Sequence, residues 1–379
     1  MTGSQRIHVL GSGPYGKYIA HCLAGLANAP PVTLILENSN SIKNWKEEGG
    51  VINVIRRGKV ISERGVQVEL AQPLAIQAHG TKPKKDIIDH LIVTTEGIKT
   101  VSMLSSIKGR LRSSSVICLL QDSLGVVEEI NSTLFSNLLE RPNYILGSIS
   151  HDLRSTNKEY TVVERSTGYT KLTMLKPLST THGDIGINCH CQGLVRRIGH
   201  AWNERPRYLM RTITRSHTLN ANGELMEKYL TSELQRLAIN SVIWPLSTVL
   251  NTPPGLLLHN YHAKSMMRDL LEELSLVIRS LPELSKMSKK DKTFSVDRLM
   301  NVVQSSIAKS RGQGLSIPSL VKARLRSNID YWNGYFVRRG IELGIRSPNN
   351  EHLIRLVKTK AAVKGFEMDL HIPFGPRKR

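Results

Sequence analysis

A glycine-rich turn near the N-terminus constrains the fold more than any other feature of this sequence. Gly11, Gly13 and Gly16 form a G-x-G-x-x-G motif between an apolar run, residues 7–10, and an apolar-periodic stretch, residues 18–27; a second apolar run follows at residues 32–36. In a strand–turn–helix the first glycine permits the turn, the second admits a pyrophosphate and the third lets the helix pack on the strand. The chain is therefore predicted to begin with a Rossmann-like dinucleotide-binding domain.

The candidate cofactor-binding residues are Gly11, Gly13, Gly16 and Glu37. Glu37 follows the second predicted strand, at the distance from the glycines where an acid suits a ribose 2′-hydroxyl and repels the 2′-phosphate of NADP. NADPH is thus disfavoured. Because tight strand-to-helix turns need glycine even where no nucleotide binds, the expectation is no cofactor, with a vestigial NAD(P) site as the alternative.

The periodicity of the remaining chain predicts two domains, and 379 residues are enough for two separate cores. Strands are expected at residues 90–94 and 116–120, in a parallel sheet, and a hairpin at residues 160–174. Helices are expected at residues 223–250, 262–281 and 327–343, with exposed loops at residues 286–292 and 304–318. The predicted division is a Rossmann-like domain at residues 1–190 and an all-α domain at residues 191–379. No apolar run is long enough to span a bilayer.

The formal charge of +21 is large for an enzyme that acts on small anions. Residues 1–150 hold 16 basic and 12 acidic side chains, which leaves 36 and 19 for residues 151–379. A polyanion partner would explain this excess, and a solubilising surface is the alternative. The candidate nucleic-acid residues interleave with Trp202 and Tyr208, a mixture suited to phosphate contact and base stacking; they are Arg196, Arg197, Arg205, Arg207, Arg211 and Arg215.

The cysteines predict neither a disulfide framework nor a metal site. Cys22 and Cys118 lie in apolar segments expected to be core, which fits a reducing compartment. On a strand, alternate side chains point to the same face, so the thiols of Cys189 and Cys191 would converge while His190 points to the other face. No metal is therefore expected.

Five segments, in the same order along the chain, resemble the ketopantoate reductase family. They are the glycine motif, LLQDSLG at residues 119–125, NYILGSISH at 143–151, RLAIN at 236–240 and NIDYWNGYFVRRGIELGIRSPNNE at 328–351, the signature segment. The resemblance implies an N-terminal dinucleotide-binding domain and a helical C-terminal domain, like 6-phosphogluconate dehydrogenase, with the active site between them. It also implies reduction of a 2-keto acid by NADPH, with a lysine as the general acid.

The departures from the family pattern fall on that chemistry. The resemblance places the lysine at Arg236, a poor proton donor at neutral pH, and the glutamate that holds the substrate hydroxyl at Asn328. A second substrate-binding asparagine becomes Trp244, while Asn240 and a serine within residues 304–306 remain. Acids also stand near the expected phosphate and nicotinamide positions, at Glu96 and Asp122. We therefore expect a non-catalytic member of the family.

The chain also resembles the fungal mitochondrial translational activator required for cytochrome b. That protein looks like a degenerate member of this reductase fold, is strongly basic and lacks a clear cleaved presequence. The resemblance implies a mitochondrial matrix protein that binds the cytochrome b mRNA or the mitochondrial ribosome, with peripheral inner-membrane association left open. The alternatives are an active 2-dehydropantoate 2-reductase and a structural protein of the mitochondrial ribosome, and the oligomeric state stays open.

Overall fold

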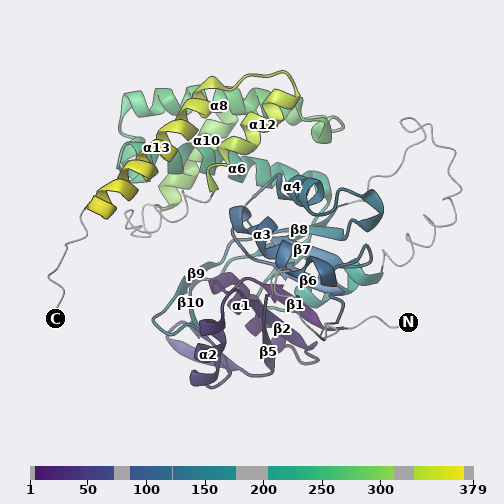
Figure 1. The fold of residues 1–379 in the computed structure, drawn as a ribbon. Helices are drawn as coiled ribbons and strands as arrows, with labels where there is room; N and C mark the ends of the chain where they lie inside the picture. The colour runs from purple at the N-terminus through teal and green to yellow at the C-terminus, as the bar shows by residue number, and fades with distance from the viewer. Residues whose placement is uncertain (1–4, 72–85, 122, 176–203, 311–327, 371–379) are drawn as a thin grey trace, which may run out of the picture. The chain divides into compact units, whose positions relative to one another are not determined.

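The computed structural model describes residues 5–71, 86–121, 123–175, 204–310 and 328–370, and they form two compact units. Unit 1 comprises residues 1–122 and 126–229, and unit 2 comprises residues 123–125 and 230–379. The predicted fold class is confirmed: a mixed Rossmann-like sheet with helices is followed by a helical unit (Figure 1). The division lies near residue 229, later than the expected boundary at 190/191. A helix at residues 204–214 causes this difference, because its Leu209 and Ile213 are buried in the core of unit 1.

The main sheet of unit 1 has eight strands in the order β12-β11-β8-β7-β6-β1-β2-β5. Six of them run parallel, β1 (Ile7–Leu10), β2 (Val32–Leu36), β5 (Val66–Leu70), β6 (His90–Val93), β7 (Val116–Leu120) and β8 (Asn143–Ile149). β11 (Thr170–Met174) pairs antiparallel with β8, and β12 (Ala221–Gly223) completes the edge. β1 lies between β2 and β6, so the strand order reverses at β1 and β6. In open α/β sheets this reversal, at the carboxyl ends of the strands, is where ligands bind.

A second sheet of four strands was not predicted. It has the order β4-β3-β10-β9, formed by β3 (Ile52–Arg56), β4 (Lys59–Glu63), β9 (Asp152–Ser155) and β10 (Thr161–Ser166). β3 and β4 form a hairpin through Arg57 and Gly58, which both have positive φ, 49° and 76°. Positive φ at both central residues is the conformation of the type I′ turn that matches the twist of a tight hairpin.

The hairpin predicted at residues 160–174 is wrong, because β10 and β11 belong to different sheets. The true hairpin is longer, with β8 and β9 in one arm and β10 and β11 in the other. Both arms pass from the main sheet to the second sheet at the same level, where the Ser150 N–H donates to the Tyr169 carbonyl at 3.0 Å. A Cβ on Gly168 would lie 2.4 Å from the His151 nitrogen, so only glycine allows the arms to cross this closely.

Helix α1 (Pro14–Ala24) packs against strands of both sheets, and every residue from Gly16 to Leu23 is buried. Its polar side chains therefore need partners inside the fold. The Lys17 ammonium donates to the Glu159 carbonyl, and the Tyr18 hydroxyl donates to the Glu164 carboxylate at 3.0 Å. Burial lowers the pKa of Lys17, while Glu159 and Glu48 act in the opposite direction. The other helices of unit 1 are α2 (Ser39–Glu47), α3 (Gly97–Ile107) and α4 (Val126–Thr133).

Unit 2 is built from helices, as predicted. They are α6 (Met226–Val249), α7 (Pro254–Leu257), α8 (Tyr261–Ser280), α9 (Lys290–Thr293), α10 (Val296–Ser310), α12 (Asn333–Glu342) and α13 (Pro348–Leu370), with α6 beginning in unit 1. The predicted loop at residues 304–318 is wrong over its first part, which continues α10. Leu299, Val303 and Ile307 are buried at helical spacing and hold that part in the core. Short α9 likewise lies across the end of the predicted loop at residues 286–292.

The signature segment forms a buried polar network in unit 2. Pro245 lies inside α6 and has no N–H to donate to the Ser241 carbonyl. The Asn333 side-chain amide donates to that carbonyl instead, at 2.9 Å, and also to Asn350 Oδ1 at 2.9 Å. Glu273 accepts the Asn350 backbone N–H at 3.0 Å and caps the start of α13. Much of this segment therefore has a structural role.

Burial and hydropathy account for two further features. Cys22 and Cys118 are buried free thiols, as predicted, and burial raises the pKa of both. Within the described part of the chain, no helix is both long and apolar enough to cross a membrane.

Candidate functional site

The glycine motif forms the predicted turn between β1 and α1. Gly11 has φ of +128°, and a Cβ there would lie 2.5 Å from Thr94 Oγ1. A Cβ on Gly16 would lie 1.9 Å from the Gly11 carbonyl oxygen, so this glycine allows α1 to pack directly on the end of β1. Gly13 is the N-cap of α1, and no atom of the described part of the chain lies within 4 Å of the position of its missing Cβ.

A small hydroxyl and amide cluster lies beside this turn, at the carboxyl ends of β6 and β7. Thr94 donates its backbone N–H to Leu10 at 2.9 Å, and this bond joins the end of β6 to the end of β1. The fully buried Thr100 hydroxyl lies 2.9 Å from Thr95 Oγ1 and 2.9 Å from Gln121 Oε1. The other amide atom, Gln121 Nε2, is buried and makes no hydrogen bond with any of the residues that the structure describes. This amide donor lies directly after the carboxyl end of β7.

Glu37 lies where the sequence places it. It directly follows β2, the strand next to β1, and its side chain is exposed. The neighbouring Asn38 is used by the fold, because its side chain caps α2 by accepting the Ser41 N–H at 2.9 Å. Glu96 is also exposed, after β6. The four candidate cofactor residues therefore lie at the carboxyl edge of two adjacent strands, β1 and β2.

Arg236, Asn240 and Trp244 form one stripe along α6, at one-turn spacing, and all three side chains are half-buried. The Arg236 guanidinium makes an ion pair with the buried carboxylate of Glu233, and its Nε donates to that carboxylate at 3.0 Å. Trp244 Nε1 donates to Asn240 Oδ1 at 3.2 Å. The side chains of Arg236, Asn240 and Trp244 are therefore all engaged with other residues of α6.

Asn328 begins the turn that leads into α12. Its backbone carbonyl accepts the N–H groups of Tyr331 and Trp332, both at 2.9 Å. Its side-chain Oδ1 is buried and makes no hydrogen bond within the described structure. A neutral amide in this position cannot act as the carboxylate that the family resemblance implies.

Only part of the predicted nucleic-acid cluster forms one surface. Arg207, Arg211 and Arg215 are exposed at one-turn spacing along and just beyond helix 204–214; we call them the arginine face. Arg205 is instead tied into unit 1, where its Nη1 lies 3.2 Å from Asp89 Oδ1 and donates to the Ser114 carbonyl at 2.9 Å. Arg196, Arg197, Trp202 and the residues Cys189, His190 and Cys191 lie outside the described residues.

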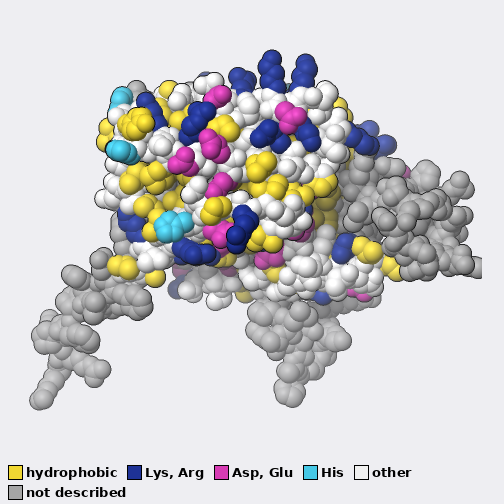
Figure 2. All heavy atoms as spheres, turned by 90° about the horizontal axis from the view of Figure 1, so that it is seen from above, with side chains coloured by type: hydrophobic (Ala, Val, Ile, Leu, Met, Phe, Trp, Pro, Cys, Tyr) yellow, Lys and Arg dark blue, Asp and Glu magenta, His cyan; other side chains and the backbone are white. Residues whose placement is uncertain are grey.

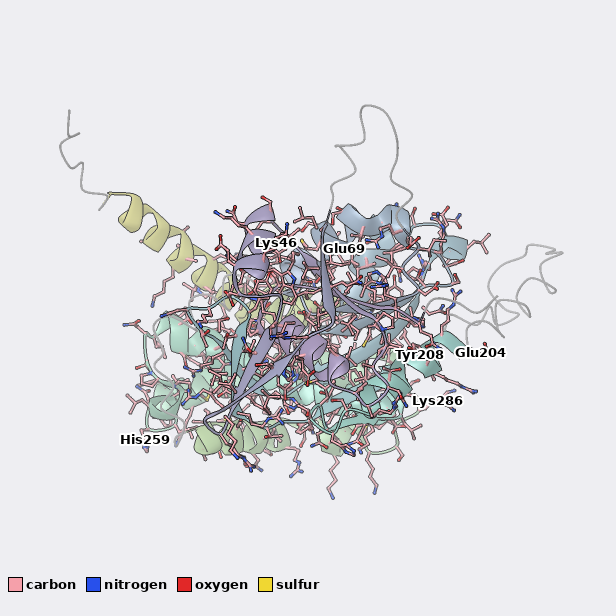
Figure 3. The ribbon with its side chains drawn as sticks, turned by 90° about the horizontal axis from the view of Figure 1, so that it is seen from below. Lys46, Glu69, Glu204, Tyr208, His259 and Lys286 are labelled. Carbon is pink, nitrogen blue, oxygen red and sulfur yellow. The ribbon has the colours of Figure 1, made fainter. Side chains whose placement is uncertain are left out.

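Tyr208 is one turn from Glu204 at the start of this helix (Figure 3), and its ring is used by the fold. It packs on His90 with ring centroids 4.8 Å apart, and its hydroxyl donates to the Gln5 carbonyl at 3.0 Å. The arrangement therefore offers phosphate-binding groups on the arginine face without the Tyr208 stacking platform that the sequence suggested.

The basic excess is spread over both units. Residues 1–229 contain 28 Lys and Arg against 19 Asp and Glu, and residues 230–379 contain 24 against 12. On the face of the helical unit seen in Figure 2, basic side chains are interspersed with acidic and apolar ones rather than gathered into one patch. Net charge therefore does not locate a charged interface, and the arrangement of the individual side chains is needed to do so.

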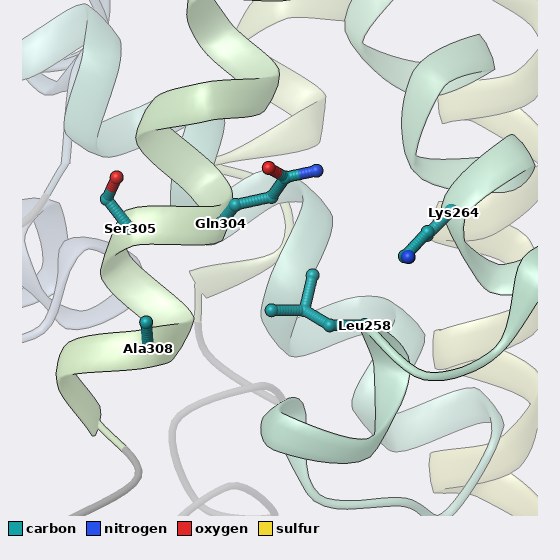
Figure 4. Close-up of a pocket in the computed structure, with 5 residues that line it drawn as sticks. All are labelled: Leu258, Lys264, Gln304, Ser305 and Ala308. Carbon is teal, nitrogen blue, oxygen red and sulfur yellow. The ribbon is translucent and has the colours of Figure 1, made fainter.

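Unit 2 has an open pocket of about 390 Å³ between the start of α8 and α10. Leu258, Lys264, Gln304, Ser305 and Ala308 line it. The side chains of Lys264 and Gln304 extend toward one another across it (Figure 4). A single exposed ammonium and an amide give this pocket little chemistry of its own.

Comparison with known proteins gives the family. The model of the N-terminal domain, ketopantoate reductase PanE/ApbA, matches residues 7–176, and the model of its C-terminal domain matches residues 228–361. The chain belongs to the ketopantoate reductase family. These matches cover most of both units.

The individual proteins compared here share little sequence identity with this chain. A probable 2-dehydropantoate 2-reductase of Schizosaccharomyces pombe is 23% identical over 93% of this chain and 96% of its own length. Among solved structures, a putative 2-dehydropantoate 2-reductase from Enterococcus faecalis has a TM-score of 0.64 at 16% identity, covering 95% of this chain and 99% of its own. D-mandelate dehydrogenase with NADH and anilino(oxo)acetate has a TM-score of 0.66 at 18% identity, with the same coverage. At these identities the structures show a shared fold.

Two functional-site features of this ketopantoate reductase family member were missed in the sequence. Glu233, which holds Arg236, could have been found because it is an acid three residues before an arginine on the same helix face. The Thr95, Thr100 and Gln121 cluster has no local signal, because it forms only when β6 and β7 become neighbours.

Proposed function

We propose that this chain is a non-catalytic member of the ketopantoate reductase family that acts as a mitochondrial translational activator, binding the cytochrome b mRNA or the mitochondrial ribosome. The observation that carries the non-catalytic part is the ion pair between Arg236 and Glu233. Hydride transfer to a keto acid leaves an alkoxide, and a positioned group must protonate it. A guanidinium held by a buried carboxylate keeps its proton at neutral pH and cannot act as that donor.

A turnover assay tests this part. Purified full-length protein is given 2-dehydropantoate with NADPH or with NADH, and no oxidation of the nucleotide is expected. The double variant Arg236→Lys with Asn328→Glu should stay inactive, because Trp244 keeps the bulk that replaces a substrate-binding asparagine. Wild-type turnover within tenfold of the roughly 10 per second that is typical of enzymes would overturn the proposal.

The arginine face supports the RNA-binding part. Arg207, Arg211 and Arg215 present three exposed guanidinium groups about 6 Å apart along the helix, and guanidinium groups bind phosphates well. If each meets one phosphate of a single strand, these contacts alone make the affinity fall about 20-fold between 50 and 200 mM salt. This magnitude is large enough to measure.

Fluorescence anisotropy with a labelled segment of the cytochrome b 5′ leader measures it. Changing Arg207, Arg211 and Arg215 together to Gln should weaken binding and remove the corresponding part of the salt dependence. The matched control changes Lys286, Lys289 and Lys292 to Gln, because these exposed side chains carry the same charge in unit 2. Equal losses in both triple variants would show that only net charge matters and would refute the arginine face as the site.

The alternative is an active 2-dehydropantoate 2-reductase, which the names of the relatives and the retained glycine turn favour. A gene deletion separates the two functions in cells. Loss of cytochrome b synthesis with its transcript still present supports the activator. A pantothenate requirement with normal mitochondrial translation supports the reductase.

A further inference from the structure

Strand β4 forms one edge of the second sheet, and no other strand of the described residues pairs with its outer side. Its first four residues are all exposed. Two of these are apolar: Val60 is 61% exposed and Ile61 is 39% exposed. An edge strand of this kind presents N–H and C=O groups with which a strand of another chain can pair.

The geometry of the β3–β4 hairpin determines which backbone groups of β4 point outward. The two residues that flank its type I′ turn form a hydrogen-bonded pair, and so does every second pair after them, such as Val54 with Ile61. The Asn53 N–H agrees with this phase, because it donates in the opposite direction, to the residue that precedes β10, at 2.9 Å. By alternation, the N–H and C=O groups of Val60 and Ser62 face away from β3.

The sequence of β4, Lys-Val-Ile-Ser-Glu, is self-complementary in one antiparallel register. A two-fold axis at Ile61 places Val60 opposite Ser62 of a second copy, so that the outward N–H and C=O groups of the two strands meet. The same register places Lys59 opposite Glu63 of the second copy, on the same face of the sheet. The two neighbouring registers that keep the hydrogen-bonding groups in phase would place Lys59 or Glu63 opposite Ile61 instead. Charge complementarity therefore selects the central register.

Within a single chain, Glu63 lies in an unfavourable place. Its carboxylate is beside the C-terminal end of α1, where a Cβ on Gly25 would lie 2.8 Å from Glu63 Oε1. The carbonyl groups at a helix C-terminus carry partial negative charge, so a carboxylate there is disfavoured. Neither Glu63 nor Lys59 makes an ion pair with any residue that the structure describes. Lys59 of a second copy would supply the cation that Glu63 lacks.

We infer that the chain forms a two-fold symmetric dimer through antiparallel pairing of two β4 strands, which joins the second sheets of both copies into one continuous sheet. The inference goes beyond the proposed function and does not depend on it, because the pairing requires neither RNA nor a keto acid. Each copy contributes a strand of five residues, a smaller contact than the standard interface of about 1,200–2,000 Å². The dimer is therefore expected to be weak, with a dissociation constant of about 10–100 µM.

Sedimentation equilibrium of the full chain, without RNA or nucleotide, tests the inference over about 5–300 µM protein. The wild type should show an equilibrium between monomer and dimer, with no larger species, because a two-fold contact closes on itself. Monomer alone throughout this range, or growth of larger oligomers, would overturn the inference.

Exchange of the two charges tests the register. Lys59→Glu and Glu63→Lys should each dimerise at least about tenfold more weakly, because each variant places like charges opposite one another. An equimolar mixture of the two variants should regain the wild-type affinity, because every charge then faces its opposite in the mixed dimer. The matched controls, Lys43→Glu and Glu47→Lys, make the same changes at exposed positions of α2. They should associate like the wild type, alone or mixed.

Two results of this exchange contradict the register. One is a mixture of the β4 variants that associates no better than either variant alone. The other is a control pair that loses and regains affinity as the β4 pair does, because net charge alone would then explain the effect.

Val60→Pro tests the backbone contact. The Val60 N–H faces away from β3, so proline removes a donor from the outer edge and leaves the hairpin hydrogen bonds in place. The variant should keep the wild-type thermal unfolding temperature and dimerise at least about tenfold more weakly. A folded Val60→Pro variant that dimerises like the wild type would show that the edge of β4 is not the interface. The turnover and anisotropy tests are unaffected by these results, so the dimer and the proposed function fail separately.

Discussion

The amide of Asn333 offers a sharp test of how unit 2 is held together. Asn333, Ser241 and Asn350 are all fully buried, and the Asn333 amide donates to Ser241 O and to Asn350 Oδ1 at 2.9 Å each. Asn333→Ala leaves both acceptors buried without this donor, at about 1–3 kcal/mol each. Because the variant also removes Asn333 Oδ1, which has no hydrogen-bond partner among the described residues, we expect a net loss of about 2–4 kcal/mol in the free energy of unfolding.

A double-mutant cycle with Pro245→Ala isolates the contact with Ser241. Alanine at 245 restores an N–H four residues beyond Ser241, so its carbonyl regains a helical donor. The cost of Asn333→Ala should then fall by about 1 kcal/mol. Urea unfolding followed by hydrogen exchange of peptides from α6 and α12 reports on this unit alone. An equal cost of Asn333→Ala in the two backgrounds would refute the argument that Asn333 replaces the donor missing at Pro245.

Three further predictions concern unit 1. Burial lowers the pKa of His8 to about 4 from its ordinary 6.5, so the stability that the neutral imidazole contributes above pH 6.5 is lost as the pH falls toward 4. The free energy of unfolding should therefore differ by about 3 kcal/mol between pH 7 and pH 4 because of this residue, and His8→Gln should reduce that difference. Gly16→Ala should destabilise by more than about 3 kcal/mol, whereas Gly13→Ala should change the unfolding midpoint little. Arg205→Ala should cost about 1–3 kcal/mol, because it leaves the buried Asp89 carboxylate and the Ser114 carbonyl without this donor, and Arg207→Ala should fall within about 0.5 kcal/mol of wild type.

The fold was predictable where its signals are local. The glycine turn sits between two apolar runs, and α8 keeps an apolar period over 20 residues, so both follow from short windows. The second sheet was missed because β3 and β10 come together from positions more than 100 residues apart, and each is only five or six residues long. Short strands with half-exposed faces leave little pattern to read.

The candidate site, too, was predictable only where its residues are close together in the sequence. The stripe of Arg236, Asn240 and Trp244 follows from one-turn spacing on a single helix. The separation of Arg205 from the arginine face could not be foreseen, because its partner Asp89 lies in a distant part of the sequence. Sequence spacing gives the face of a helix, but only tertiary contacts decide which charges on it are neutralised.

The buried network of the signature segment also bears on the order in which unit 2 can assemble during synthesis. The donor to the Ser241 carbonyl, Asn333, lies 92 residues further along the chain. Asn350, whose N–H donates to the Glu273 carboxylate at the start of α13, lies 77 residues beyond Glu273. Until these arrive, α6 and α8 expose an unpaired carbonyl and an apolar face. When α6, α8 and α10 have left the ribosome, most of the core of unit 2 has been synthesised, but Asn333 and the start of α13 have not. The unit therefore stays accessible to chaperones and proteases until α13 emerges. A stop codon before residue 350 should yield a chain that is degraded.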